Sequence, residues 1–239
     1  MKKIVLCFTV IMVFLSCNKD KDNNNNDKVR LLEAIIESNG RHTQFEYDQR
    51  NRITKFSVYQ NENFIHSQTF TYSGNDLVKV VLDDNTILEF TKEGNIITVK
   101  DSSLIIYLNN DGTLAKLEET YSDEWGSHSQ SINFLYNGGN MTNLTTSEGD
   151  VFADYQYDNE KPLFHHCKTP KWYLMLFSDY LFGNRNNATL LNYHWGITIN
   201  YQYEYDEDGF PVKCIESRER QDESPTTTNI EYKYKAIIE

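Results

Sequence analysis

The sequence predicts an all-β protein in which antiparallel hairpins follow one another, up and down, and roll into an open or partly closed barrel-like sheet. Three observations support this fold class. One short phrase recurs along the chain, strand-like alternation fills the stretches between its copies, and a single apolar segment interrupts the series. A β-sandwich built from the same hairpins is the alternative.

The recurring phrase holds two aromatic or large apolar residues one position apart, a polar turn with Asn, Asp or Gly, and a short alternating run. It is clearest at Phe45–Phe56 and recurs, with variation, at Phe70–Val81, Leu88–Val99, Ile106–Leu117, Phe134–Leu144, Tyr155–Lys161 and Tyr203–Lys213. Residues one position apart share a face of a strand, and Asn, Asp and Gly tolerate the positive φ of a tight turn. Each copy therefore predicts a β-hairpin, and their spacing, mostly about 18 to 28 residues, predicts a meander.

In chain order, the first segment is a predicted lipoprotein signal peptide at residues 1–16. Lys2 and Lys3 precede an almost wholly apolar run that is too short to span a membrane as a helix. Phe14–Cys17 resembles a bacterial lipoprotein box, which implies cleavage before Cys17 and attachment of lipid to its thiol. An ordinary signal peptide, with Cys17 incidental, is the alternative.

Residues 17–28 form a predicted disordered tether, because this Asn- and Asp-rich segment has almost no apolar surface to bury. Its Lys19–Asp22 pattern resembles the export signal of surface lipoproteins of Bacteroidetes, which implies an outer-membrane lipoprotein exposed at the cell surface. A periplasm-facing lipoprotein is the alternative. Without Lys2 and Lys3 the chain has 21 basic and 35 acidic residues, a net charge of −14, which argues against nucleic-acid binding.

Residues 29–239 are predicted to form a single β domain. Val29–Ser38 fits a first strand, or alternatively a short helix, and strand–turn–strand units then run from Phe45 to Tyr157. We expect a polar loop at Ser122–Ser129. The alternation in Thr226–Glu239 predicts a closing strand.

The interruption predicts one short helix at about residues 170–182. Thr169 is a candidate N-cap, Pro170 suits the first helical turn and Gly183 suits a C-cap. The segment is too apolar for an exposed surface helix, so we expect it to pack across the sheet or to plug one end of the rolled sheet. An exposed element that docks on a membrane or a partner is the alternative.

No sequence motif assigns a catalytic residue, a metal or a cofactor. His165–Cys167 offers three ligand types, but adjacent residues on an extended chain point to opposite faces and rarely bind one ion. Asp206–Gly209 lacks the later Glu of a calcium loop and is predicted to be a hairpin turn. Cys167 and Cys214 could form a disulfide in an oxidising envelope, or they could remain buried free thiols.

These features together resemble a known family. The aromatic phrase is similar to the YD repeats of RHS-type shells, although those repeats are more regular and occur in far longer chains. A closer likeness is to Bacteroidetes lipoproteins of unknown function that are described as having a porin-like fold. The lipidated start with its tether, the serial aromatic hairpins and the late apolar interruption, here Lys161–Asn187, carry this likeness. Ala188 departs from the family, which usually has Pro there. The resemblance implies a rolled antiparallel sheet and no established activity.

The function predicted from the sequence is that of a non-enzymatic, lipid-anchored binding or accessory module whose ligand is a glycan or a protein, with no cofactor. The strands carry Lys, Glu, Asp and Gln among the apolar positions, whereas a lipid-embedded barrel needs a continuous outward apolar band, so the lipid alone is the expected anchor. Sixteen tyrosines among 32 aromatic residues either pack the core or line a binding face. The alternatives are an envelope glycoside hydrolase with two carboxylates within about 10 Å in a cleft, and a structural or assembly component.

Overall fold

The computed structural model describes residues 28–123, 126–177 and 181–237, so the predicted signal peptide, the lipidation at Cys17 and the tether up to residue 27 lie outside it. Within the described residues the chain forms sixteen β-strands and one α-helix. The elements are β1 (Val29–Glu37), β2 (Arg41–Tyr47), β3 (Ile53–Gln60), β4 (Asn63–Ser73), β5 (Asp76–Leu82), β6 (Ile87–Glu93), β7 (Ile96–Val99), β8 (Leu104–Leu108), β9 (Leu114–Asp123), β10 (Gly126–Asn137), β11 (Asn140–Thr146), β12 (Val151–Tyr157), α1 (Lys171–Phe177), β13 (Ala188–Tyr193), β14 (Ile197–Tyr205), β15 (Pro211–Arg220) and β16 (Thr226–Ile237).

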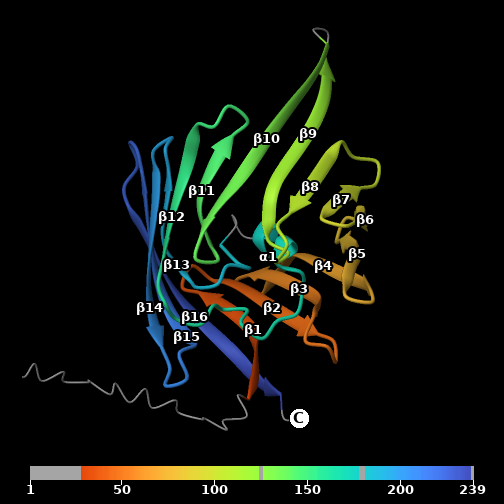
Figure 1. The fold of residues 1–239 in the computed structure, drawn as a ribbon. Helices are drawn as coiled ribbons and strands as arrows, with labels where there is room; N and C mark the ends of the chain where they lie inside the picture. Colours follow the sequence, from red (N-terminus) through yellow and green to blue (C-terminus); the bar gives the residue numbers. More distant parts are fainter. Residues whose placement is uncertain (1–27, 124–125, 178–180, 238–239) are drawn as a thin grey trace, which may run out of the picture.

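All sixteen strands belong to one closed antiparallel barrel, in which each strand pairs with its neighbours in sequence (Figure 1). β1 and β16 close the ring, from Val29 opposite Ile237 to Glu37 opposite Ile230. The predicted all-β meander and its barrel-like shape are confirmed, and the β-sandwich alternative is wrong. Closure leaves no unpaired strand edge, which removes the usual route to edge-to-edge aggregation.

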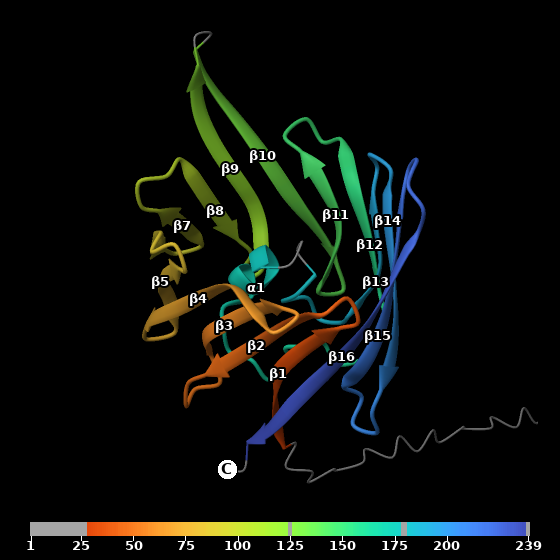
Figure 2. The ribbon, with the colours of Figure 1, turned by 180° about the vertical axis from the view of Figure 1, so that it is seen from behind.

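Strand alternation places an apolar set of side chains inside the ring. On β2, for example, Thr43 and Phe45 are buried whereas Gln44 and Glu46 are exposed. The same alternation along the other strands gathers one continuous apolar core within the lumen. The helix α1 lies inside the ring of strands in both views (Figure 1 and Figure 2).

The barrel has two different ends, because successive turns alternate between them. One end, called here the plugged end, carries the start of β1, the end of β16, the turns at 48–52, 74–75, 94–95, 109–113, 138–139 and 206–210, and the insertion 158–187 between β12 and β13. The other end, called here the mouth, carries the turns at 38–40, 61–62, 83–86, 100–103, 147–150, 194–196 and 221–225, together with the end of β9 at Asp123 and the start of β10 at Gly126.

The recurring phrase has a structural role at the plugged end. Its second aromatic residue occupies a register shift of the sheet directly before the turn, as at Tyr47, Tyr72, Tyr136, Tyr157 and Tyr205. The hydroxyls of the first three donate to backbone carbonyls of the preceding strand at 2.6 to 2.7 Å. A bulge of this kind increases the local twist of its strand and changes the direction of the side chain. In the copies with Tyr47, Tyr72 and Tyr136, the phrase therefore fastens its hairpin to the preceding one.

The predicted polar loop at Ser122–Ser129 is wrong. β9 continues to Asp123 and β10 begins at Gly126, and the two strands form a hairpin that reaches beyond its neighbours (Figure 2). The Tyr121 ring stacks on His128 with 5.5 Å between centroids, and cross-strand pairs of this kind stabilise an extended hairpin.

The predicted short helix is present as α1, from Lys171 to Phe177. Residues 178–180 lie outside the described part of the chain, and residues 181–183 are not helical, so the helix does not reach the predicted end near residue 182. No helix in the described residues is long and apolar enough to cross a membrane.

Candidate functional site

The insertion between β12 and β13 enters the lumen from the plugged end. Trp172 and Tyr173 of α1 are buried. The ring of Trp172 lies 5.2 Å from that of Phe90 on β6, and the ring of Tyr173 lies 5.3 Å from that of Phe70 on β4. The predicted plug is confirmed, and the alternative of an exposed docking helix is wrong, because the apolar face of α1 is already covered.

Hydrogen bonds tie the insertion to the turns around it. The Lys168 N–H donates to the Asn51 carbonyl at 2.9 Å, and the Ile53 N–H donates to Thr169 Oγ1 at 2.8 Å. On β11, the Met141 N–H donates to the side-chain carbonyl of Asn184 at 2.9 Å. Because buried backbone groups must find partners, these bonds hold the plug as a fixed part of the fold.

The residues predicted to cap the helix have other roles. Thr169 bonds β3 instead of α1, and the Pro170 carbonyl accepts the first helical hydrogen bonds, from Tyr173 and Leu174. Gly183 has a φ of +83°, but it lies six residues beyond the end of α1. A Cβ there would lie 2.7 Å from the Lys171 carbonyl oxygen, so glycine is required where the returning chain passes against the helix.

His165–Cys167 joins the insertion to the first strand. The Arg30 N–H donates to Nδ1 of His166 at 3.1 Å. The segment is thus a polar loop that leads to the helix, as predicted. Nowhere in the described ranges do three or more His, Cys, Asp or Glu side chains gather closely enough to hold a metal ion.

Asp206–Gly209 forms the predicted hairpin turn between β14 and β15. The Asp206 carboxylate accepts from the N–H groups of Asp208 and Phe210 at 3.0 Å. The Arg30 guanidinium lies 2.6 Å from the same carboxylate. These bonds account for the acidic cluster as a turn that is fastened to β1.

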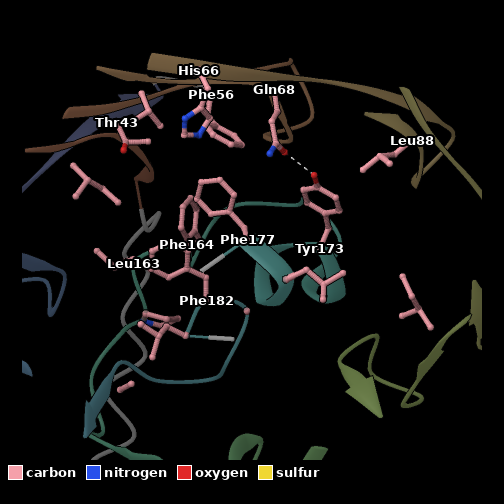
Figure 3. A pocket seen from close by; sticks show the side chains of 18 of the residues that line it. Thr43, Phe56, His66, Gln68, Leu88, Leu163, Phe164, Tyr173, Phe177 and Phe182 are labelled. Atoms are coloured by element: carbon pink, nitrogen blue, oxygen red, sulfur yellow. Dashed lines mark hydrogen bonds between the residues drawn. The ribbon is translucent and has the colours of Figure 1, made fainter. Parts of the chain in front are cut away.

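Beside the plug, the lumen holds a cavity of about 1010 Å³. Its floor consists of apolar side chains from the insertion, including Leu163, Phe164, Phe177 and Phe182. Of these, Phe164 and Phe177 point toward Phe56 of β3 (Figure 3). Residues of the mouth, some of them exposed, also line it: Arg41, Ile87, Lys100, Asp101 and Ser102. The cavity therefore reaches the surface at the mouth, and its volume lies at the upper end of the range of about 300 to 1,000 Å³ for small-molecule sites.

The wall of the cavity on β2 and β4 carries a few hydrogen-bonding groups among apolar ones. Thr43, His66 and Gln68 project from these strands toward the insertion (Figure 3). The Tyr173 hydroxyl donates to Gln68 Oε1 at 2.7 Å. An apolar floor with a small number of oriented polar groups is the usual composition of a ligand site.

Four carboxylates line the cavity, those of Glu37, Glu89, Asp101 and Glu216. Three of them have a cationic neighbour. Arg41 lies 3.7 Å from Glu37, Lys100 lies 2.5 Å from Glu89, and Arg218 lies 3.6 Å from Glu216. The hydrogen bond from Lys100 lowers the pKa of Glu89 below its ordinary value. The general acid of a glycosidase needs a raised pKa, which a cationic neighbour opposes.

Cys167 and Cys214 are free thiols in the structure. Burial raises the pKa of Cys214, on β15, to about 12, and burial also raises the pKa of Cys167 in the insertion. Because the thiolate is the reactive form, thiols with raised pKa values are poor nucleophiles. Neither residue is therefore a candidate catalytic nucleophile.

Among solved structures, the chain is similar to a porin-like protein from Bacteroides uniformis ATCC 8492, with 16% sequence identity and a TM-score of 0.36. The match covers 86% of this chain and 95% of that chain. No family model matches the chain, and no curated protein matches it. The architecture described above rests on the chain's own strand pairing.

Sequence reasoning placed the plug but missed the cavity beside it. One signal could have shown it. His66 and Gln68 share a face of β4 with the core residue Phe70, and two polar residues at core-facing positions indicate that the space before them is not filled by apolar packing.

Proposed function

We propose that this protein is a non-enzymatic binding protein that holds a small ligand with an apolar body inside its barrel. One observation carries the proposal: the plug closes one end of the lumen and leaves an aromatic-floored cavity of about 1010 Å³ that opens at the mouth. A cavity of this kind encloses a small molecule and admits no folded partner. It therefore favours a small ligand over the protein ligand that the sequence left open.

The proposal includes the lipid anchor. A lipid on Cys17 would hold the protein at the outer membrane, at the cell surface or, alternatively, facing the periplasm. β1 starts at the plugged end, so the segment after Cys17 joins the barrel there and the mouth is the end farther from the anchor. Exposed Glu33, Glu46 and Glu231 on outward strand positions support anchoring by lipid over immersion of the barrel.

A glycoside hydrolase is the weaker candidate. Its general acid needs surroundings that disfavour the charged form, whereas Glu37, Glu89 and Glu216 each have a cation within 4 Å. No specific contact in the described residues favours a structural or assembly role.

Titration with N-phenyl-1-naphthylamine, an uncharged dye whose emission rises in apolar surroundings, tests the proposal. The chain from Asn18 onward carries no lipid and contains the complete barrel, because the closed sheet uses only residues 29–237. Thr43→Trp places a large ring in the cavity, and Gln44→Trp places the same ring on the outer face of the same strand.

We expect saturable dye binding by the unsubstituted chain, binding at least about tenfold weaker in Thr43→Trp, and unchanged binding in Gln44→Trp. A tenfold loss corresponds to about 1.4 kcal/mol, well within what blocking a small-molecule site removes. Absence of dye binding, or equal binding by all three proteins, would overturn the proposal.

A further inference from the structure

Acidic residues concentrate at the mouth. In the described part of the chain, the mouth turns hold eight acidic residues and a single basic one. The acidic residues are Glu62, Asp83, Asp84, Asp101, Glu148, Asp150, Asp222 and Glu223, and the basic one is Lys100. The described residues of the plugged-end turns and of the insertion hold seven acidic and six basic residues. A ligand approaching the cavity therefore meets a negative field, and a rim of one sign raises the local concentration of molecules of the opposite sign.

The side chains that line the cavity also carry a net negative charge. Its four carboxylates stand against Arg41 and Lys100, which leaves a net charge of −2, or −1 when Arg218 beside Glu216 is counted. An anionic head group would thus be repelled both at the entrance and inside.

A patch of tyrosines gives the cavity wall a surface that suits a cation. Tyr201 and Tyr203 on β14 and Tyr232 on β16 all line the cavity. The Tyr203 ring centroid lies 6.4 Å from that of Tyr201 and 6.4 Å from that of Tyr232. β15 runs between these strands, and there the small, buried Cys214 lies directly opposite Tyr203. The rings of Tyr203 and Tyr232 can therefore stack across the side chain of Cys214.

Glu216 adds a carboxylate to this patch. It lies directly opposite Tyr201 in the pairing of β14 with β15, and it also lines the cavity. The faces of tyrosine rings attract ammonium groups through their quadrupole, and the Glu216 carboxylate adds negative charge, which Arg218 at 3.6 Å offsets in part. Clusters of aromatic side chains are a recognised way of binding quaternary ammonium groups.

We propose that the ligand is a cationic amphiphile, with its ammonium head against Tyr201, Tyr203, Tyr232 and Glu216 and its apolar body against the plug. This inference rests on the proposed function and specifies its ligand class. The apolar floor formed by Phe164, Phe177 and Phe182 receives the body, and the acidic mouth favours entry of the positive charge.

A matched series of twelve-carbon ligands tests the inference with the chain from Asn18 onward. Dodecyltrimethylammonium, 1-dodecanol and dodecanoate share one apolar chain and carry a positive, a neutral and a negative head group. Each is used below its micelle concentration at pH 7.4 to displace N-phenyl-1-naphthylamine. We expect the cation to bind about tenfold more tightly than dodecanoate, with the alcohol between them.

Two variants locate the head group. Glu216→Gln removes the carboxylate, and Tyr201→Leu removes one ring while keeping an apolar side chain. Each should lower the ratio of the affinity for the cation to that for the alcohol by about threefold or more. Glu231→Gln makes the same charge change on an exposed outward position of β16 and should leave the ratio unchanged.

The outcomes separate the two proposals. If the dye and all three ligands fail to bind, the proposed function itself is wrong. If the dye binds but dodecanoate binds as tightly as the cation, or Glu216→Gln and Tyr201→Leu leave the ratio intact, the cavity is a ligand site and the cationic head group is wrong.

Discussion

The plugged end and the mouth of this barrel are built from different kinds of sequence. The turns of the plugged end belong to the recurring aromatic phrase, and their tyrosines donate hydrogen bonds to the preceding strand at Tyr47, Tyr72 and Tyr136. The mouth turns share no such phrase and are mostly acidic. The regular part of the sequence thus builds the end of the barrel that the insertion closes, whereas the irregular part surrounds the mouth.

The two ends also differ in how many large hydrophobic side chains they expose. Six of the nine large hydrophobic side chains exposed in the described part of the chain lie within three residues of a mouth turn: Phe64, Ile65, Ile87, Tyr121, Val151 and Trp195. At the plugged end, Trp172, Leu174 and Met175 are buried inside the ring. Stability should therefore depend mainly on the plugged end, and ligand binding on the mouth and the cavity.

The largest effect should come from the two tryptophans, one at each end. Trp172 is 3% exposed and packs on Phe90, whereas Trp195 is 58% exposed in a mouth turn. Trp172→Ala should lower the free energy of unfolding by about 3 to 5 kcal/mol, the usual cost of removing a buried Trp. Trp195→Ala should cost less than about 1 kcal/mol. Urea unfolding followed by circular dichroism measures both.

Equal losses in the two variants would contradict the division of the barrel into a stabilising end and an exposed end. Thermal unfolding of the same two proteins provides an independent check, because a core loss of this size lowers the Tm by several degrees.

The hairpins and the plug could be predicted from the sequence because both are local. A phrase such as Phe45–Phe56 contains its two strands and its turn, and the apolar run after Pro170 is unlike its polar surroundings. Closure of the sheet could not be predicted, because it depends on pairing β1 with β16, which lie at opposite ends of the described chain. No local pattern specifies such a contact.

The end of the helix and the cavity were missed for a related reason. Gly183 has the positive φ of a C-cap, but that conformation serves a close approach to Lys171 that only the folded chain creates. The cavity is the space left after Phe56, Phe164 and Phe177 have packed, so it depends on side chains from distant segments. The order of residues in the sequence does not reveal such a cavity.

Two glycines with positive φ at the plugged end differ in the space around them, and substituting them tests how closely the insertion is packed. A Cβ at Gly183 would lie 2.7 Å from a backbone oxygen, whereas a Cβ at Gly74 would meet nothing within 4 Å. Gly183→Ala should therefore cost about 2 to 3 kcal/mol, and Gly74→Ala about 1 kcal/mol from backbone strain alone. Chemical denaturation of both variants decides this, and a Gly183→Ala protein as stable as Gly74→Ala would show that the plug can move aside.

One threonine of the insertion and one of the cavity wall should differ in their contribution to stability. Thr169 is 3% exposed and accepts the Ile53 N–H, whereas Thr43 faces the cavity. Thr169→Val should cost about 1 to 2 kcal/mol, because it leaves a buried N–H without its acceptor. Thr43→Val should stay within about 0.5 kcal/mol of the original stability. Hydrogen exchange should also show faster exchange at Ile53 in Thr169→Val only; protection of that amide in the variant would mean that another acceptor replaces the hydroxyl.

The smallest effect concerns acid, and it again separates the ends. Burial acts to raise the pKa of Asp206, but hydrogen bonds from the Phe210 N–H, the Arg30 side chain and the Asp208 N–H outweigh it, so the pKa lies below the ordinary 3.8. A carboxyl whose pKa is depressed by folding contributes stability above its unfolded pKa and loses that contribution as the pH falls through the folded pKa. Asp206→Asn should therefore be less stable than the original protein near neutral pH, and the difference should shrink as the pH falls below about 4.

At the mouth, hydrogen bonds from Thr86 also lower the pKa of Asp84. Because Asp84 lies in an exposed turn, Asp84→Asn should show the same trend with a smaller amplitude. The urea midpoints of the two variants and of the original protein, measured from pH 7 to pH 3, give the stability lost in each variant. A larger pH-dependent loss for Asp84→Asn than for Asp206→Asn would contradict the conclusion that the plugged end contributes more to stability than the mouth.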